Sequence, residues 1–286
     1  MVLTFGLLAI SVCAVWLQQI NINHCSIPIW SIFLCASMIS GFFLNYIEIN
    51  GICWIVLFGF IAILAKKSGQ YKVLHTCLLF ITGGAALLLA SGRFSGFINP
   101  AIVTDMRFSP DDIAFTHHLH FDATAVGIIL MAVFCNPVRS THEWRLILKK
   151  TYPIIILTLI AVLSSGVLLH YITVDVKFIP YSLIFLVTNL LFTCVVEEAF
   201  FRGFVQEQLA RAMACWPVGH YIAALLSALL FGISHIKGGY VLVLLASLAG
   251  LFYSHAYLKI KRIEASILTH FSLNAVHFLA FTYPNL

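Results

Sequence analysis

The sequence predicts an all-α fold, a polytopic transmembrane helical bundle of about eight to ten spans. Hydrophobic residues make up 61% of the 286 positions and charged residues only 9%. A soluble domain of this length carries about a quarter charged residues. Because so few charges cannot cover a water-facing surface, most of the chain must face lipid. We therefore expect an integral membrane protein in contact with the lipid bilayer.

Ten apolar segments approach the length of about 20 residues that a spanning helix needs. The third and fifth are short, which leaves the number of spans open. The first lacks a basic start and a small-residue cleavage site, so we interpret it as a retained span rather than a signal peptide. In chain order the segments cover roughly residues 2–20, 27–47, 50–65, 73–92, 121–136, 152–171, 179–201, 218–235, 240–258 and 264–282.

The distribution of lysine and arginine predicts the orientation of these segments. If all ten cross, alternate loops fall on opposite sides of the membrane, and cytoplasmic loops should carry the excess of positive charge. One side then holds Lys66, Lys67, Lys72, Arg139, Arg145, Lys149, Lys150, Arg202, Arg211, Lys259, Lys261 and Arg262, and the other holds Arg93, Arg107, Lys177 and Lys237. This bias supports ten crossings, with the larger set in the cytoplasm and both termini outside.

Charge and cysteine content exclude other classes of protein. The net charge of +5 comes from short loops between spans rather than from a basic face, so we expect no nucleic-acid partner. The eight cysteines are scattered singly without a C-x-x-C pair, so we expect buried reduced thiols rather than disulfides or metal ligands. The oligomeric state cannot be predicted from these features.

The longest polar segment, about residues 93–122, falls on the outer side. It contains a cluster of possible metal ligands, but their spacing matches no metal motif, and neighbouring side chains point in different directions. We therefore interpret it as a solvated loop rather than a metal site. The cluster consists of His117, His118, His120, Asp111, Asp112 and Asp122.

Two adjacent carboxylates, Glu197 and Glu198, end an apolar run that begins near residue 179. A charge at the bilayer centre costs at least about 2.5–3.5 kcal/mol, so these groups need partners, protonation or a wet cavity. Arg202 follows Glu198 at i,i+4, which on a regular helix places the two on one face. Glu197 lies about 100° further around the helix and is left to point elsewhere. A structural Glu–Arg pair is the alternative interpretation.

Three polar residues on the following spans are candidates to meet Glu197. Glu197 and His235 lie equally far along the chain on either side of Trp216, so an antiparallel hairpin that turns there brings them level. His270 and Asn274 lie at i,i+4 on one face of the last span. Taken singly, such residues are more often satisfied core histidines or interhelical hydrogen bonds. Together they can direct Glu, His, His and Asn to one point.

The chemistry of this group is that of peptide hydrolysis. A carboxylate and an imidazole that share one water can remove its proton and make it nucleophilic. A second histidine and an asparagine amide can donate hydrogen bonds to the oxyanion of a tetrahedral intermediate.

Three stretches carry a family resemblance: Glu197-Glu198-Ala199-Phe200-Phe201-Arg202, Phe231-Gly232-Ile233-Ser234-His235 and His270-Phe271-Ser272-Leu273-Asn274. They resemble the signature of the CAAX-protease and bacteriocin-processing (Abi) family of intramembrane glutamic-type endopeptidases, over about residues 180–280. The resemblance implies that Glu197 and His235 activate the attacking water and that Glu198 and Arg202 support Glu197. It also implies that His270 and Asn274 stabilise the oxyanion. Residues 176–286 would form the catalytic helical core, and residues 1–175 would be transmembrane helices of unknown role.

The resemblance also sets the expected cofactor, partner and location. We expect no cofactor, because the Glu–His mechanism needs no metal and H-E-x-x-H is absent. Zn²⁺ is the alternative, since one carboxylate and two histidines suffice for a catalytic site, and His277 extends the face of His270. The expected substrate is a membrane-anchored protein or peptide with a C-terminal sorting or CAAX-like tail. The expected location is the prokaryotic inner (plasma) membrane.

Two other classes of function stay open. A proton-coupled transporter also uses intramembrane Glu, His and Arg, but transporters usually show internal symmetry and paired broken helices, and neither is visible. A non-catalytic immunity or scaffold protein that retains the motif is the second alternative.

Overall fold

The computed structural model describes residues 1–22, 25–108 and 113–284. Helices account for most of this part of the chain, which confirms the all-α prediction. The sequence did not predict the four short strands. Strand β1 (Ile20–Ile22) pairs with β2 (Cys25–Ile27), and β3 (Ala101–Met106) pairs with β4 (Phe115–His118). Because β1 and β2 occupy the first connection, the first helix ends at Ala14 rather than near residue 20.

The chain forms two compact units that do not follow the order of the sequence. These units do not test the predicted division of roles between residues 1–175 and residues 176–286, which stays a prediction. Unit 1 consists of Met1–Ala101, His118–Arg139 and Leu191–Phe200, and unit 2 of Ile102–His117, Ser140–Leu190 and Phe201–Leu286.

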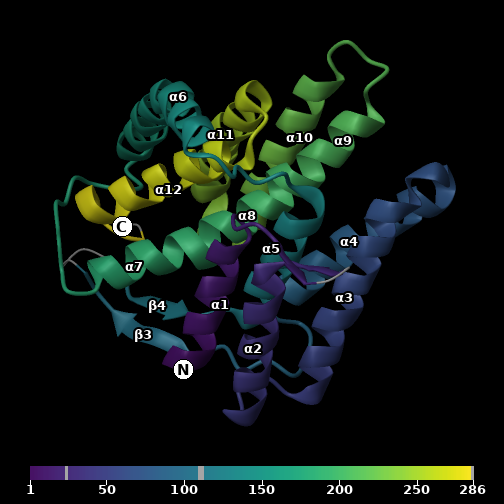
Figure 1. Cartoon of the computed structure of the whole chain (residues 1–286). Coiled ribbons are helices and arrows are strands. Elements are labelled where there is room, and N and C mark those ends of the chain that lie inside the picture. Colours follow the sequence, from purple (N-terminus) through teal and green to yellow (C-terminus); the bar gives the residue numbers. More distant parts are fainter. Residues whose placement is uncertain (23–24, 109–112, 285–286) are drawn as a thin grey trace. The chain divides into compact units, whose positions relative to one another are not determined.

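In unit 1, apolar helices pack against helices that are near them in the sequence, and several of them pack against α5 (Figure 1). Helix α1 packs against α2, and α3 packs against both α4 and α5. The short helix α8 also packs against α5. The bounds are Val2–Ala14 for α1, Ile29–Phe43 for α2, Ile49–Lys67 for α3, Lys72–Ala90 for α4, Phe121–Phe134 for α5 and Val195–Glu198 for α8.

Unit 2 is built around the pair α10 and α11 (Figure 1). These helices approach so closely that a Cβ on Gly232 would overlap the Oγ of Ser247. Helix α12 packs against both α11 and α6. The bounds are Thr141–Leu168 for α6, Ser182–Thr188 for α7, Glu207–Ala212 for α9, Gly219–Ser234 for α10, Gly239–Ile260 for α11 and Ile263–Ala280 for α12.

The candidate carboxylates lie on one long helix, Ser182–Ala212, of 31 residues. The sequence predicted a span that ends near residue 201. The helix continues because Glu, Gln, Leu, Ala and Arg in the stretch EQLARA all favour helix. It contains α7, α8 and α9, which are separated by two π-helical stretches, η2 (Asn189–Cys194) and η3 (Ala199–Gln206).

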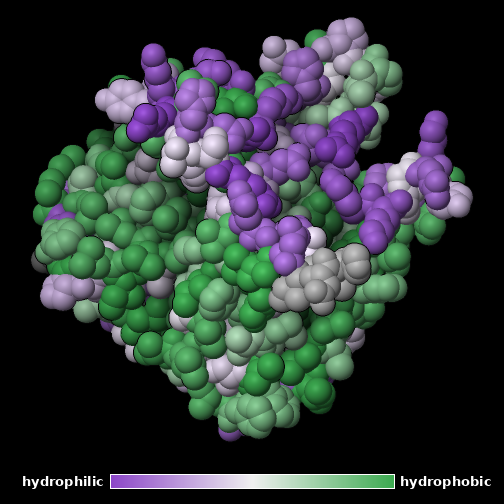
Figure 2. Space-filling model, in the orientation of Figure 1, coloured by the Kyte–Doolittle hydropathy of each residue, from purple (hydrophilic) through white to green (hydrophobic). Residues whose placement is uncertain are grey.

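The described surface is that of a membrane protein. Five helical segments are long and apolar enough to cross a bilayer: Ile49–Gln70, Lys72–Ala90, Thr141–Leu168, Ser182–Ala212 and Ile236–Ile260. Shorter apolar helices cover Val2–Ala14, Ile29–Phe43, Phe121–Phe134 and Gly219–Ser234. Figure 2 shows that hydrophobic residues make up most of the visible face. The chain is an integral membrane protein, and its number of crossings stays a prediction.

The cysteines correct one expectation. Cys13, Cys35, Cys53 and Cys77, which lie in helices, are exposed rather than buried, whereas Cys194 is buried as predicted. A thiol behaves as a small hydrophobic group. In a lipid-facing helix it therefore needs no cover from protein.

Contacts between loops within each unit agree with the predicted alternation of sides. In unit 1, Ile47 forms a β-bridge with Phe97, which joins two loops assigned to the outer side. In unit 2, Val174 forms a bridge with Phe281, again between predicted outer segments. At the predicted cytoplasmic end of unit 2, Arg262 forms an ion pair of 2.9 Å with Glu143. Loops that meet must lie on one side of the membrane, so each of these pairs shares a side as expected, and which side is cytoplasmic stays a prediction.

Candidate active site

Glu197 and Glu198 lie in unit 1, at the end of α8, where two helices touch almost backbone to backbone. A Cβ added to Gly127 of α5 would lie 2.8 Å from the Cα of Val196. Real Cβ atoms essentially never approach another atom so closely, so only glycine fits here. Glu198 is fully buried and Glu197 is partly buried. The glycine contact therefore fixes the backbone of the turn that carries both carboxylates.

The helix around these carboxylates is not a regular α-helix. The π-helical stretches η2 and η3 precede and follow α8. Such wide turns, with i→i+5 hydrogen bonds, are rare and frequently mark functional sites. The prediction of a uniform helix is therefore wrong over these stretches. Arg202 lies within η3, so its direction relative to Glu198 is not that of an ordinary i,i+4 pair, and the proposed pairing of the two stays a prediction.

Arg202 lies in unit 2 and is fully buried between α10 and α11. Its Nη2 donates a hydrogen bond of 3.1 Å to the carbonyl oxygen of Gly250. Its Cζ lies 4.6 Å from the centre of the Phe231 ring and 5.2 Å from that of Tyr253. A cation over aromatic rings in a desolvated site gains about 2 kcal/mol or more. The guanidinium is thus held by a carbonyl and two ring faces.

Further polar contacts within unit 2 hold the same end of the long helix. Gln206 Nε2 donates to the carbonyl of Ser254 at 3.1 Å, one turn along from the contact between Arg202 and Gly250. The Oγ of Ser227 donates to the carbonyl of Phe201 at 2.7 Å. Sequence reasoning missed these residues, because Ser and Gln in apolar helices carry no motif. Their contacts position η3 against α10 and α11.

His235 caps the C-terminus of α10, and its tautomer follows from its contacts. Its Nδ1 lies 2.8 Å from the carbonyl oxygen of Phe231 and 3.2 Å from the Oγ of Ser234. A carbonyl oxygen can only accept, so Nδ1 carries a hydrogen. In the neutral imidazole, Nε2 then holds the lone pair. His235 is therefore set up to accept a proton or a hydrogen bond at Nε2.

His270 and Asn274 lie on α12, as predicted. His270 is buried, and its ring stacks on Tyr253 with centroids 4.6 Å apart and an interplanar angle of 16°. The Nδ2 of Asn274 donates to the Oδ1 of Asn189 at 3.2 Å. Asn189 and Tyr253 were not predicted, because neither belongs to the motifs and their partners lie far away in sequence.

Phe231 is the common neighbour of three candidate residues. Its ring centroid lies 4.8 Å from that of His235 and 5.6 Å from that of His270. The guanidinium of Arg202 covers the same ring. Unit 2 therefore brings Arg202, His235 and His270 together around one aromatic side chain. In the sequence, Phe231 was noted only as the first residue of the stretch that ends at His235.

His277, which belongs to the zinc alternative, makes a hydrogen bond in the structure. Its Nε2 lies 3.1 Å from the carbonyl oxygen of Thr282. That nitrogen therefore carries a hydrogen and cannot bind a metal. Within residues 1–22, 25–108 and 113–284, no three His, Cys, Asp or Glu side chains are grouped so as to hold a metal ion. Whether the reaction uses a metal stays open to experiment.

The histidines of the outer loop serve the structure of the loop. In unit 1, Asn99 Nδ2 contacts His120 Nδ1 at 3.2 Å and Asp122 Oδ1 at 3.3 Å. In unit 2, the Nδ1 of His117 contacts the hydroxyl of Tyr181. In the described part of this segment, His117 and His120 thus make side-chain contacts within the protein. Asp111 and Asp112 lie outside the described residues.

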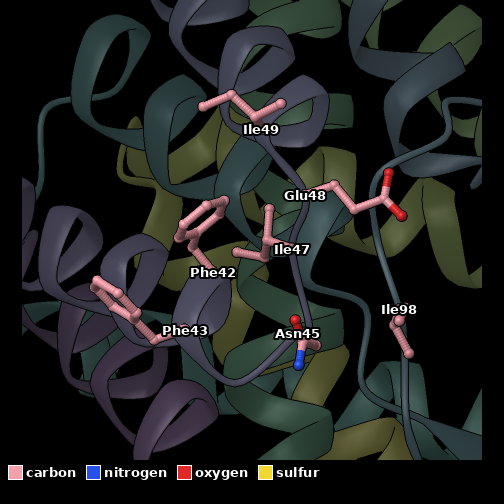
Figure 3. A pocket seen from close by; sticks show the side chains of 7 residues that line it. All are labelled: Phe42, Phe43, Asn45, Ile47, Glu48, Ile49 and Ile98. Carbon is pink, nitrogen blue, oxygen red and sulfur yellow. The ribbon is translucent and has the colours of Figure 1, made fainter.

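A hollow of about 390 Å³ in unit 1 has none of the six candidate residues in its lining. It opens where α2 gives way to α3, and Figure 3 shows Phe42, Ile47 and Glu48 among its lining side chains. Sequence reasoning gave no role to this region.

Comparison with known families supports the endopeptidase interpretation. Residues 179–276 match the family described as type II CAAX prenyl endopeptidase Rce1-like. This segment is similar to that family. It includes Glu197, Glu198, Arg202, His235, His270 and Asn274 and ends before His277, which confirms the resemblance seen in the three motifs. No curated protein and no solved structure gives a significant match.

The family gives the general activity of the Rce1-like segment. The match indicates a protease of the CAAX endopeptidase class, and hence a hydrolase, and implies a membrane-embedded peptide or protein as substrate. The match covers the C-terminal third of the chain, so the role of the preceding helices is not defined by it.

Proposed function

We propose that the chain hydrolyses a peptide bond in a membrane-anchored protein or peptide, with Glu197 and His235 as the groups that activate water. The observation that carries the proposal is the contact of 2.8 Å between the Nδ1 of His235 and the carbonyl oxygen of Phe231, from which the tautomer of His235 follows. With Nδ1–H bound to the carbonyl of Phe231, the Nε2 lone pair can accept a hydrogen bond from water. The other proton of the same water can then be taken by a carboxylate, which is Glu197 in this proposal.

The lengths of the helices support the meeting of these two groups. The helical stretch from Glu197 to its end at Ala212 is nearly as long as the stretch from Gly219, where α10 begins, to His235. At a rise of about 1.5 Å per residue, the stretch from Gly219 to His235 is about 24 Å long. In the proposal, the long helix and α10 form a hairpin that places Glu197 and His235 at one depth.

In the proposed reaction, the water oxygen attacks the carbonyl carbon of the scissile bond while Glu197 takes a proton from the water. His270 and Asn274 donate hydrogen bonds to the resulting oxyanion. The carbon–nitrogen bond then breaks, and the leaving amine takes the proton from Glu197. The products are a carboxylic acid and an amine, and Glu197 is regenerated. No metal is needed in this scheme.

Glu198 and Arg202 have a supporting role in the proposal. Burial of both residues means that each charge needs compensation in the membrane. Arg202 is anchored by Gly250, Phe231 and Tyr253, so it can act as a fixed positive charge. We propose that it compensates Glu198, so that Glu197 rather than Glu198 binds the water.

The proposed substrate carries a C-terminal sorting or CAAX-like tail, and the proposed location is the prokaryotic inner membrane. The test is incubation of the purified protein in nanodiscs with two fluorescent peptides. One is a farnesylated peptide that ends in a CAAX tail, and the other is a transmembrane helix with a polar C-terminal tail. We expect cleavage of at least one at a single bond, identified by product mass, and its loss in His235→Gln. Proton flux across proteoliposomes without any cleavage would instead indicate a transporter.

A further inference from the structure

Asn189 is a polar residue at the first position of η2, on the same long helix as the carboxylates. It is 7% exposed. Its Oδ1 accepts the hydrogen bond of 3.2 Å from the Nδ2 of Asn274. The two amides belong to helices that are far apart along the chain. Neither the family motif nor the proposed reaction gives Asn189 a role.

The pair of amides is closed on one side by aromatic side chains. One helical turn away on both helices, Phe185 and Phe278 stack with ring centroids 3.9 Å apart. Together with Tyr181 they form a buried cluster, and Phe108 and Tyr283 pack against it. Such a cluster keeps water from reaching the amides from that direction. A hydrogen bond in these surroundings is stronger, and an unsatisfied amide is more costly, than in water.

The contact determines which end of the Asn274 amide is available as a donor. An amide group has one acceptor oxygen and two N–H donors on its nitrogen. With one N–H bound to the Oδ1 of Asn189, the second N–H has a defined direction. If the Asn274 amide were flipped, so that its oxygen and nitrogen changed places, two carbonyl oxygens would face each other. With Asn189 presenting its oxygen, the contact therefore opposes a flip of the Asn274 amide and holds the Asn274 nitrogen, with its second N–H, in one position.

We propose that Asn189 is a positioning residue that holds the Asn274 amide with its N–H directed to the reacting carbonyl. This inference rests on the proposed function, in which Asn274 donates to the oxyanion. Removal of one oxyanion donor costs about 10²–10³ in kcat. Loss of its orientation should reduce kcat in the same way without weakening substrate binding in the ground state.

Three single variants of the full chain test the role. Asn189→Leu removes the acceptor but keeps the approximate volume, Asn189→Asp keeps an acceptor oxygen, and Phe185→Leu disturbs the packing one turn away. With the two fluorescent peptides in nanodiscs, we expect Asn189→Leu to lower kcat about 10²-fold with KM near that of the wild type. We expect Asn189→Asp to recover most of kcat, and Phe185→Leu to lower the melting temperature while kcat stays near wild type.

A double-variant cycle on melting temperature tests the contact independently of activity. If the amides are partners, Asn189→Leu combined with Asn274→Leu should lower the melting temperature by clearly less than the sum of the two single losses. Additive losses would overturn the contact. Normal kcat in Asn189→Leu, beside impaired Asn274→Leu, would overturn the positioning role and leave the proposed function intact.

Two other results would contradict the proposed reaction rather than the role of Asn189. Full activity in both Asn274→Leu and Glu197→Gln would overturn the proposed function. Failure of the wild-type protein to cleave either peptide would also overturn it, and the inference would fall with it.

Discussion

Two neighbouring stretches of the helix Ser182–Ala212 are held in different ways. Residues 195–198, which carry the carboxylates, are placed by the close approach of Val196 to Gly127. Arg202, on the next turn of the helix, is placed by a hydrogen bond to Gly250 and by the rings of Phe231 and Tyr253. A glycine contact thus fixes the backbone in one stretch, and polar and aromatic contacts fix the side chain in the other.

The difference teaches how a membrane enzyme can keep charged groups in an apolar setting. A proton acceptor must exchange its proton during catalysis, so a rigid set of donors around it would lower its basicity. Fixing its backbone positions it without that cost. An arginine side chain stays charged throughout the reaction, so its charge has to be compensated at every step. Contacts to the side chain itself are therefore favourable. The expected effects below test this contrast, in decreasing order of size.

The largest effect should follow from removing the charge of Glu198. If Glu198 compensates the buried guanidinium, Glu198→Gln leaves a charge whose partner is lost, which typically costs about 3–5 kcal/mol. We expect a low yield of folded protein, measured by size-exclusion chromatography in detergent. The double variant Glu198→Gln with Arg202→Met should recover part of the yield, because the charge itself is gone. If Glu198→Gln folded as well as the wild type, the pairing would be disproved.

A smaller effect is expected at the glycine contact. In Gly127→Ala the added Cβ meets the Cα of Val196 at 2.8 Å, and such overpacking typically costs about 1–3 kcal/mol. The melting temperature and the rate of peptide cleavage should both fall, since the helix turn with Glu197 must shift. Gly84→Ala is the matched control, because its Cβ would meet no atom within 4 Å, and it should keep or slightly raise stability. Equal behaviour of the two variants would show that the contact does not position the carboxylates.

The smallest expected effect is that of metal removal. In the proposed mechanism, a membrane-permeant zinc chelator should leave the cleavage rate unchanged, and the purified active protein should contain less than stoichiometric metal by mass spectrometry. Inactivation by the chelator, with recovery on addition of Zn²⁺, would replace the metal-free mechanism with a zinc site that includes Glu197, His235 and His270.

The sequence predicted the helices well because lipid imposes a simple pattern. Each of the ten apolar segments contains or overlaps a helix among the described residues, since a chain in hydrocarbon must satisfy its backbone hydrogen bonds within itself. The exact ends were less predictable. The extension of the long helix to Ala212 and the β1–β2 hairpin occur in segments where composition alone does not fix the boundary.

The candidate site could be predicted only in part, for a related reason. Glu197, Arg202 and His270 stand out because ionisable groups are rare in apolar spans. Asn189 and Tyr253 do not stand out, since the importance of each comes from a partner on a different helix, Asn274 for the first and His270 for the second. The π-helical turns likewise have no reliable signal in one sequence. Supporting contacts are a property of tertiary packing, which residue types alone do not reveal.

The rate of peptide cleavage by Glu197→Gln tests the central claim most directly. Glutamine keeps the size and hydrogen-bonding capacity of glutamate but cannot accept a proton from water. A neutral amide also costs less in the membrane than a carboxylate, so the variant should insert and fold normally. We predict a decrease in kcat of about 10²–10⁴, the usual contribution of a general base, with an unchanged melting temperature. A well-folded Glu197→Gln variant that cleaves the peptide at the wild-type rate would contradict the proposed mechanism.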